Sequence, residues 1–287
     1  MSGGVMQSVA TYGRMIKFSH SIFAMPFALA ATVIAARQVA VTPLQVGLII
    51  VCMVFARSFA MGINRIVDRS FDAQNPRTAI REIPSGQISL GAARGLTAAA
   101  AALFVVAAFL LNPLCGYLSP VALAVVGGYS YAKRFTALVH LWLGVALGLA
   151  PIAVWIALTG TVGAVPLVLA AAVATWVAGF DILYSLQDED FDRGQGLRSI
   201  PVALGRVGAM WVSGLLHLGT AGLLAALPSL APLGWPYWVG WALITGVLAY
   251  EHWLVRPDDL SKINKAFFDL NGYVSLIFFG AVLAATL

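Results

Sequence analysis

The sequence has little charge and almost no cysteine. Only 10% of its 287 residues are Asp, Glu, Lys or Arg, whereas 60% belong to the set AVILMFWYC. Soluble domains carry about 25% charged residues, so this composition argues against a water-soluble globular protein. Cys52 and Cys115 stand in apolar stretches without the spacing of a metal site or a disulfide framework. The basic excess of +5 is spread too thinly to indicate a nucleic-acid partner.

The apolar residues form nine segments, each a candidate membrane crossing. A helix needs about 20 apolar residues to cross a hydrocarbon layer of about 30 Å. The segments run over 18–36, 43–66, 92–111, 117–132, 137–158, 164–187, 207–227, 235–254 and 266–287. The first follows Arg14 and Lys17 as a signal peptide would, but its apolar run is longer than usual, so we expect a retained helix.

The charges of the connecting loops fall on one side of the predicted membrane. With the N-terminus in the cytoplasm, every Lys and Arg except Arg37 and Arg57 lies at the cytoplasmic side, and so do the acidic residues. The positive-inside rule then places the C-terminus on the opposite side. We expect a multi-pass protein of the cytoplasmic (inner) membrane whose chemistry lies at its cytoplasmic mouth, with the lipid bilayer as a partner.

Two acidic motifs follow the second and sixth predicted helices. Asn64, Asp68 and Asp72 are spaced i, i+4, i+8, and we call them the first ladder; Asp188 and Asp192, the second ladder, repeat the i, i+4 pair 120 residues after Asp68 and Asp72. If the helices continue, each ladder lies along one helix face. A single such pair is more often a solvated helix end, but two at equivalent positions of two half-bundles favour a shared site.

Clustered carboxylates need a cation to offset their repulsion. Neither ladder contains Cys or His. Ligands that are all oxygen suit a hard cation such as Mg²⁺, which also binds substrate phosphates. The ladders therefore predict Mg²⁺ as cofactor and a diphosphate as ligand.

Two ionisable residues lie deeper in the predicted membrane. Arg57 precedes Asn64 by seven residues, and Asp181 precedes Asp188 by seven. Ionisable residues at this depth are costly and normally face one another or a polar cavity. They are either a structural ion pair or a pocket in which Arg57 holds an acidic aromatic substrate and Asp181 orients or deprotonates it.

Further motifs surround the ladders, and together they resemble the UbiA-type intramembrane aromatic prenyltransferases. The set is FSHSIFAMPFAL before the first ladder, REIPSG after it, YSYAKRFT at 129–136, GLRSIP after the second ladder and FFDLNGYVS in the last helix. One departure is Arg65, where many members have Asp directly after the Asn. The role of that additional Asp in metal binding is therefore in question here.

The resemblance implies a fold and an activity. The implied fold has nine transmembrane helices around a central cavity, and the implied reaction is Mg²⁺-dependent ionisation of a polyprenyl diphosphate with transfer to an aromatic ring. Lys133 matches the diphosphate lysine of the family, and Arg57 and Asp181 match its aromatic pocket. We expect residues 1–287 to form a single transmembrane domain of two pseudo-repeated halves, with cap loops at about 68–91 and 188–206.

The chemistry assigns roles to further side chains. Positive charge stabilises a diphosphate leaving group, for which Arg77, Arg81 and Arg198 are candidates beside Lys133. The allylic cation needs a dry pocket with aromatic faces. Candidates for this pocket are Phe27, Tyr129, Tyr131, Trp155 and Tyr184.

The acceptor and the class of function remain open between alternatives. The strings NPRTAIREIPSG and QDEDFDRGQGLRSIP look most like the menaquinone branch that runs through futalosine, whose acceptor is a dihydroxynaphthoate. The alternative is a 4-hydroxybenzoate polyprenyltransferase of ubiquinone biosynthesis. Transfer to haem or chlorophyllide has no supporting motif, and a cation transporter would need charges across the whole bilayer.

Overall fold

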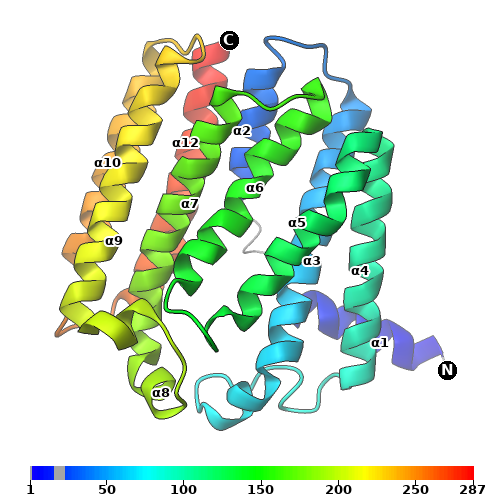
Figure 1. Ribbon diagram of the computed structural model, residues 1–287, viewed down its shortest axis with the longest axis vertical. Coiled ribbons are helices and arrows are strands. Elements are labelled where there is room, and N and C mark those ends of the chain that lie inside the picture. Colours follow the sequence, from blue (N-terminus) through cyan, green and yellow to red (C-terminus); the bar gives the residue numbers. More distant parts are fainter. Residues whose placement is uncertain (1, 16–22) are drawn as a thin grey trace. The chain divides into compact units, whose positions relative to one another are not determined.

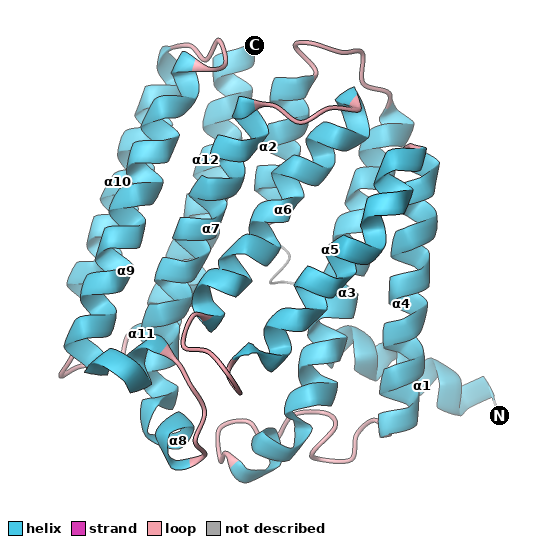
Figure 2. Cartoon of the chain, in the orientation of Figure 1, coloured by secondary structure: helices cyan, strands magenta, loops and turns pink. Residues whose placement is uncertain are grey.

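The computed structural model describes residues 2–15 and 23–287 and is helical. Within these ranges no strand occurs, and only an isolated bridge pairs Arg256 with Asp259 (Figure 2). The chain forms two compact units, Met1–Ser21 with Gly47–Tyr131, and Ile22–Val46 with Ala132–Leu287.

Four helices make up most of the first unit: α1 (Ser2–Met15), α3 (Pro43–Gln74), α4 (Leu90–Leu111) and α5 (Pro113–Ala132). α1 runs across one end of α3 and α4 (Figure 1). Tyr12 fixes this arrangement, because its hydroxyl donates to the carbonyl of Ser58 at 2.8 Å and lies 3.2 Å from the hydroxyl of Thr97. The ring itself packs with Met15, Ile88 and Ala93 in a buried cluster.

The second unit is built around the long helix α7. Its elements are α2 (Met25–Ala35), α6 (Val139–Thr159), α7 (Ala164–Ser185), η2 (Leu186–Asp188), α8 (Glu189–Gly194), α9 (Ile200–Ala226), η3 (Leu227–Ser229), α10 (Trp235–Leu254), α11 (Ile263–Lys265), η4 (Ala266–Leu270) and α12 (Asn271–Thr286). α7 packs against α6 and α9, and α12 against α10 and α2 (Figure 1). The backbones of α6 and α7 approach closely at Gly144, where a Cβ would collide with the carbonyl of Ala174.

The prediction of an all-α membrane protein is confirmed. In the described part of the chain, seven helices are long and apolar enough to cross a membrane. α2 and α10 lie at the other two predicted positions, which is compatible with nine crossings. α2 spans 11 residues of the predicted segment 18–36; positions 18–22, with Lys17 and the start of the motif FSHSIFAMPFAL, lie outside the described residues.

Two helix ends differ from the sequence prediction near the ladders. α3 continues to Gln74, so the first part of the expected cap segment 68–91 is helical. α9 begins at Ile200 rather than 207, with a kink at Gly205, whose φ of 68° is accessible to glycine. The predicted single domain, internal repeat and central cavity stay predictions.

Candidate functional site

The first ladder lies on uninterrupted α-helix. Because α3 runs to Gln74, Asn64, Asp68 and Asp72 share one face at successive turns. The amide nitrogen of Asn64 donates to Oδ2 of Asp68 at 2.9 Å, and the amide oxygen of Asn64 accepts from Nη1 of Arg65 at 3.4 Å. The buried Arg65 therefore holds the Asn64 amide with its nitrogen toward the ladder.

Asp72 is the most enclosed member of the first ladder, with 5% of the residue exposed. Arg81 from the following loop donates to its Oδ1 at 2.6 Å, and Thr78 donates to its backbone carbonyl at 3.2 Å. The other carboxylate oxygen, Oδ2, is buried without a hydrogen-bond partner in the described structure. An unpartnered buried carboxylate oxygen is costly, and a hard cation would satisfy it.

Two other basic residues of the first unit were predicted to bind substrates. Arg57 lies within α3, and its Nε is buried with no hydrogen-bond partner among the described residues. Arg77 has an exposed side chain in the loop after α3, and its backbone N–H donates to Oδ1 of Asn75 at 3.0 Å. Arg57 thus has hydrogen-bonding capacity left for an anionic ligand.

The second ladder lies on a broken helix. α7 ends at Ser185, the short 3₁₀ helix η2 follows, and Asp188 is the residue that precedes α8, which carries Asp192. Glu189, the first residue of α8, accepts from Arg193 at 2.9 Å and from Arg206 of α9 at 3.3 Å. The bond from Arg206 holds α8 against α9.

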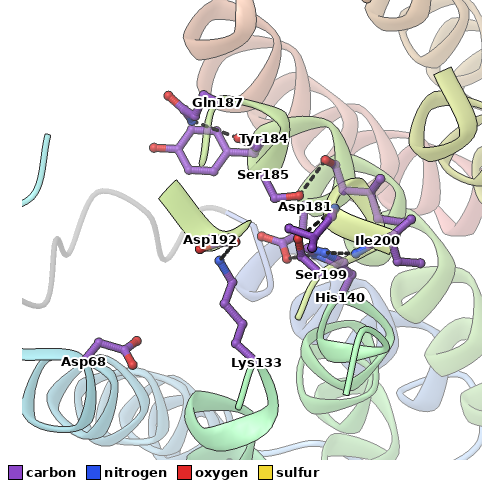
Figure 3. Close-up of polar contacts among 12 residues, drawn as sticks. Asp68, Lys133, His140, Asp181, Tyr184, Ser185, Gln187, Asp192, Ser199 and Ile200 are labelled. Atoms are coloured by element: carbon purple, nitrogen blue, oxygen red, sulfur yellow. Dashed lines mark hydrogen bonds and ion pairs between the residues drawn. The ribbon is translucent and has the colours of Figure 1, made fainter. Parts of the chain in front are cut away.

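Lys133 is the basic partner of the second ladder. Its Nζ donates to Oδ2 of Asp192 at 2.7 Å, and Asp192 is only 2% exposed (Figure 3). Burial lowers the pKa of Lys133, but the charge and hydrogen bond of Asp192, followed by the charges of Asp188 and Asp181, outweigh it and raise the pKa above its ordinary value. The lysine is therefore charged and compensates three acids.

Arg198 fastens the segment that carries Lys133. Its backbone N–H donates to the carbonyl of Lys133 at 2.7 Å, and its Nη1 donates to the carbonyl of Phe135 at 2.8 Å. The predicted diphosphate ligand Arg198 thus positions residues 133–135, while its side chain remains exposed.

Asp181 has a histidine partner that the sequence analysis did not assign to the site. Nδ1 of His140 on α6 lies 2.7 Å from Oδ2 of Asp181 on α7, and His140 is fully buried (Figure 3). A histidine at the start of an apolar segment, four residues after the motif YSYAKRFT ends, was the signal available in the sequence. Tyr184, one turn further along α7, is half-buried and packs on Phe267 with a ring-centre distance of 4.0 Å.

Comparison with known proteins identifies the family of the chain. Residues 24–279 match the UbiA prenyltransferase family. The chain belongs to this family. It is 31% identical over 228 residues to the 4-hydroxybenzoate octaprenyltransferase of Cupriavidus necator, covering 79% of this chain and 80% of that one. The resemblance drawn from the motifs is confirmed, and the chain is an enzyme, a prenyltransferase.

Solved structures of the family have the same fold. The apo structure of a UbiA homolog from Aeropyrum pernix K1 is 34% identical, with a TM-score of 0.86 over 94% of this chain and 99% of that one. A UbiA homolog from Archaeoglobus fulgidus bound to DMAPP and Mg²⁺ is 20% identical, with a TM-score of 0.76 over 96% of this chain and 99% of that one. At 20% identity, the likeness to the Archaeoglobus fulgidus homologue concerns the fold alone.

In this prenyltransferase each unit brings together its own predicted site residues. The first gathers Asn64, Asp68, Asp72 and Arg81, and the second gathers Lys133, Asp192, Asp188 and Asp181. Within the described residues, no group of three or more His, Cys, Asp or Glu side chains is arranged to hold a metal ion. The joint action of the two ladders on one metal-diphosphate ligand stays a prediction.

Proposed function

We propose that this prenyltransferase transfers a polyprenyl group from a polyprenyl diphosphate to a carboxylated aromatic acceptor, with Mg²⁺ as cofactor. The observation that carries the proposal is the chemistry of the two ladders. In the first, the almost fully buried Asp72 lies near the end of the long helix α3 and pairs with Arg81. In the second, the similarly buried Asp192 lies on the short helix α8 and pairs with Lys133. Membership of the UbiA family and the Mg²⁺ and DMAPP bound by the Archaeoglobus fulgidus homologue support it.

The proposed metal ligands are the ladder side chains, Asn64, Asp68, Asp72, Asp188 and Asp192. The unpartnered Oδ2 of Asp72 fits such a role, because it is an anionic oxygen with unused acceptor capacity. Bound Mg²⁺ would neutralise charge on the departing diphosphate. Asn64 must turn its amide to present oxygen to a metal, since in the structure the nitrogen faces Asp68.

The basic side chains bind the diphosphate in this proposal. Lys133 and Arg81 are charged neighbours of the ladders and can exchange an aspartate oxygen for a phosphate oxygen. The exposed arginines Arg77 and Arg198 lie in the loops beside them and add positive charge. Breaking the allylic carbon–oxygen bond leaves its electron pair on the diphosphate, so these cations lower the barrier as that charge develops.

The acceptor is bound by residues deeper in the helices. We propose that the unpaired Nε of Arg57 donates to the acceptor carboxylate, that Asp181 accepts a hydrogen bond from its ring hydroxyl, and that Tyr184 contacts the ring. A hydroxyl that donates to a carboxylate makes the ring more electron-rich and hence a better nucleophile toward the allylic cation. The catalytic residues of the proposal are therefore Asp181 and Arg57.

Two acceptors are each favoured by a specific observation. The Cupriavidus necator relative, which is 31% identical, carries the name 4-hydroxybenzoate octaprenyltransferase, and this name supports 4-hydroxybenzoate as acceptor. The strings after each ladder resemble the futalosine branch of menaquinone synthesis, which supports a dihydroxynaphthoate. Both molecules combine a carboxylate with a ring hydroxyl, so the proposed roles of Arg57 and Asp181 hold for either.

A purified enzyme assay separates these acceptors. The protein in lipid nanodiscs is incubated with a polyprenyl diphosphate, Mg²⁺ and one acceptor, and products are identified by mass spectrometry. We expect one prenylated product and release of diphosphate. Failure of both acceptors, with the polyprenyl diphosphate left intact, contradicts the proposal.

A substitution tests the role of Arg57 in acceptor binding. Arg57→Ala should raise the acceptor KM roughly 10-fold, because a hydrogen-bonded charge contact is lost. Arg37→Ala, which removes an exposed bond to the carbonyl of Thr286, is the matched control.

The proposed location is the cytoplasmic membrane, with the N-terminus and both ladders on the cytoplasmic side. The distribution of Lys and Arg among the loops supports this orientation. A periplasmic alkaline phosphatase reporter fused after Leu287 should be active. An inactive phosphatase, with a cytoplasmic reporter active at the same position, would reverse the orientation.

A further inference from the structure

His140 of α6 contacts two other helices of the second unit, α7 and α9, through one imidazole ring. It is the second residue of α6 and is completely buried. Its Nδ1 lies 2.7 Å from Oδ2 of Asp181 on α7, and its Nε2 lies 3.4 Å from the backbone nitrogen of Ile200, the first residue of α9 (Figure 3). The ring therefore lies behind the Asp181 carboxylate, on the side away from solvent.

The hydrogen bonds assign the tautomer of this ring. A backbone N–H can only donate, so Nε2 of His140 accepts from Ile200 and carries no proton. The proton of the neutral ring is then on Nδ1, which donates to Oδ2 of Asp181. Asp181 is held as a hydrogen-bond acceptor without any need for a charged histidine.

The contact also limits how Asp181 can turn. The side chain of Asp181 is 22% exposed, whereas that of His140 is 1% exposed. With Oδ2 fixed toward the buried ring, Oδ1 is the oxygen that can meet a ligand from the open side. A carboxylate fixed at one oxygen presents the other in a defined direction, which is how supporting hydrogen bonds orient side chains that contact substrate.

We propose that His140 is a positioning residue for acceptor binding: its Nδ1–H holds Oδ2 of Asp181 so that Oδ1 accepts the hydroxyl of the aromatic acceptor. This rests on the acceptor-binding role of Asp181 in the proposed function. The bond to Ile200 is a separate, structural role, since it satisfies a backbone N–H in the first turn of α9 that has no partner within the helix. The two roles use different nitrogen atoms and can be separated by substitution.

The matched pair His140→Asn and His140→Gln makes this separation. The amide nitrogen of Asn reaches the place of Nδ1 and can donate to Asp181, whereas the amide of Gln reaches the place of Nε2 and can accept from Ile200. We expect the His140→Gln variant to lose roughly 10- to 100-fold in kcat/KM for the acceptor, with an unchanged KM for the polyprenyl diphosphate. The His140→Asn variant should keep the wild-type acceptor kcat/KM within about threefold.

Thermal unfolding and an Asp181→Asn variant complete the experiment. If His140 has a structural role alone, the Tm should fall most in the His140→Asn variant, and the acceptor kcat/KM of the variants should fall in the same order as their Tm. That result overturns the proposal. Wild-type kinetics of the His140→Gln variant also overturn it. If Asp181→Asn lowers acceptor kcat/KM while His140→Gln does not, only the positioning role fails; if Asp181→Asn is itself without effect, the acceptor role of Asp181 in the proposed function fails too.

Discussion

The two ladders have the same residue spacing but different backbones. The first lies on α3, which remains α-helical through Asp72, so its side chains are aligned by helix geometry alone. The second crosses from the 3₁₀ helix η2 into the short helix α8, so its two aspartates are placed by contacts with other segments. Equal spacing in the sequence therefore does not mean equal local structure.

The cations that pair with the ladders differ in the same way. Arg81 lies nine residues after Asp72, in the loop that continues from the same helix. Lys133 lies 59 residues before Asp192 and comes from the connection between α5 and α6. The negative charge of Asp72 is thus compensated by a cation close to it in the sequence, whereas that of Asp192 is compensated by a cation that only the tertiary structure brings near. This difference suggests that the first ladder tolerates loss of its cation better than the second.

The largest expected effect comes from the ladder carboxylates themselves. Asp68→Ala and Asp188→Ala should each lower kcat by roughly 100- to 1000-fold, because groups that stabilise charge in the transition state are lost. Turnover with a polyprenyl diphosphate and Mg²⁺ is measured at saturating acceptor. Asp190→Ala is the control, since Asp190 is an exposed residue of α8 outside the ladder. Retained turnover in both ladder variants would remove metal binding by the ladders from the mechanism.

An intermediate effect is expected from the paired cations. Lys133→Met should raise the KM for polyprenyl diphosphate roughly 10- to 100-fold, because a charged hydrogen bond is lost and three acids lose their compensation. Arg81→Met should raise it only about threefold, because Arg81 pairs with a single carboxylate, that of Asp72. Lys133→Arg keeps the charge and tests whether charge alone suffices. Equal effects of the two Met variants would contradict the distinction between local and tertiary compensation.

The features predicted correctly from the sequence are those that local chemistry determines. Long apolar runs specify membrane helices, and the i, i+4, i+8 spacing of Asn64, Asp68 and Asp72 needs only a continuing helix, which α3 provides. The motifs that surround the ladders were sufficient for the family. These signals can be read within a few turns of chain.

The features that were missed depend on contacts between distant segments. His140 and Asp181 are 41 residues apart, and Lys133 and Asp192 are 59 residues apart, so neither pairing follows from spacing. The break after Ser185 is also tertiary, because α8 is held by Arg206 from the next long helix. The sequence alone did not indicate which of the four histidines contacts a site residue, because that contact depends on how α6, α7 and α9 pack.

The smallest expected effect separates direct from indirect roles of the exposed arginines, one beside each ladder. Arg198 is bonded to the carbonyl of Phe135, so we expect Arg198→Ala to raise the KM for polyprenyl diphosphate about threefold by loosening residues 133–135. Arg77 is exposed in the loop after the first ladder, and we expect a similar or smaller effect in Arg77→Ala. Salt screens exposed charges, so the Arg77→Ala effect should vanish between low and high ionic strength, whereas the Arg198→Ala effect should persist. An Arg198→Ala effect that disappears with salt would instead assign Arg198 to direct diphosphate binding.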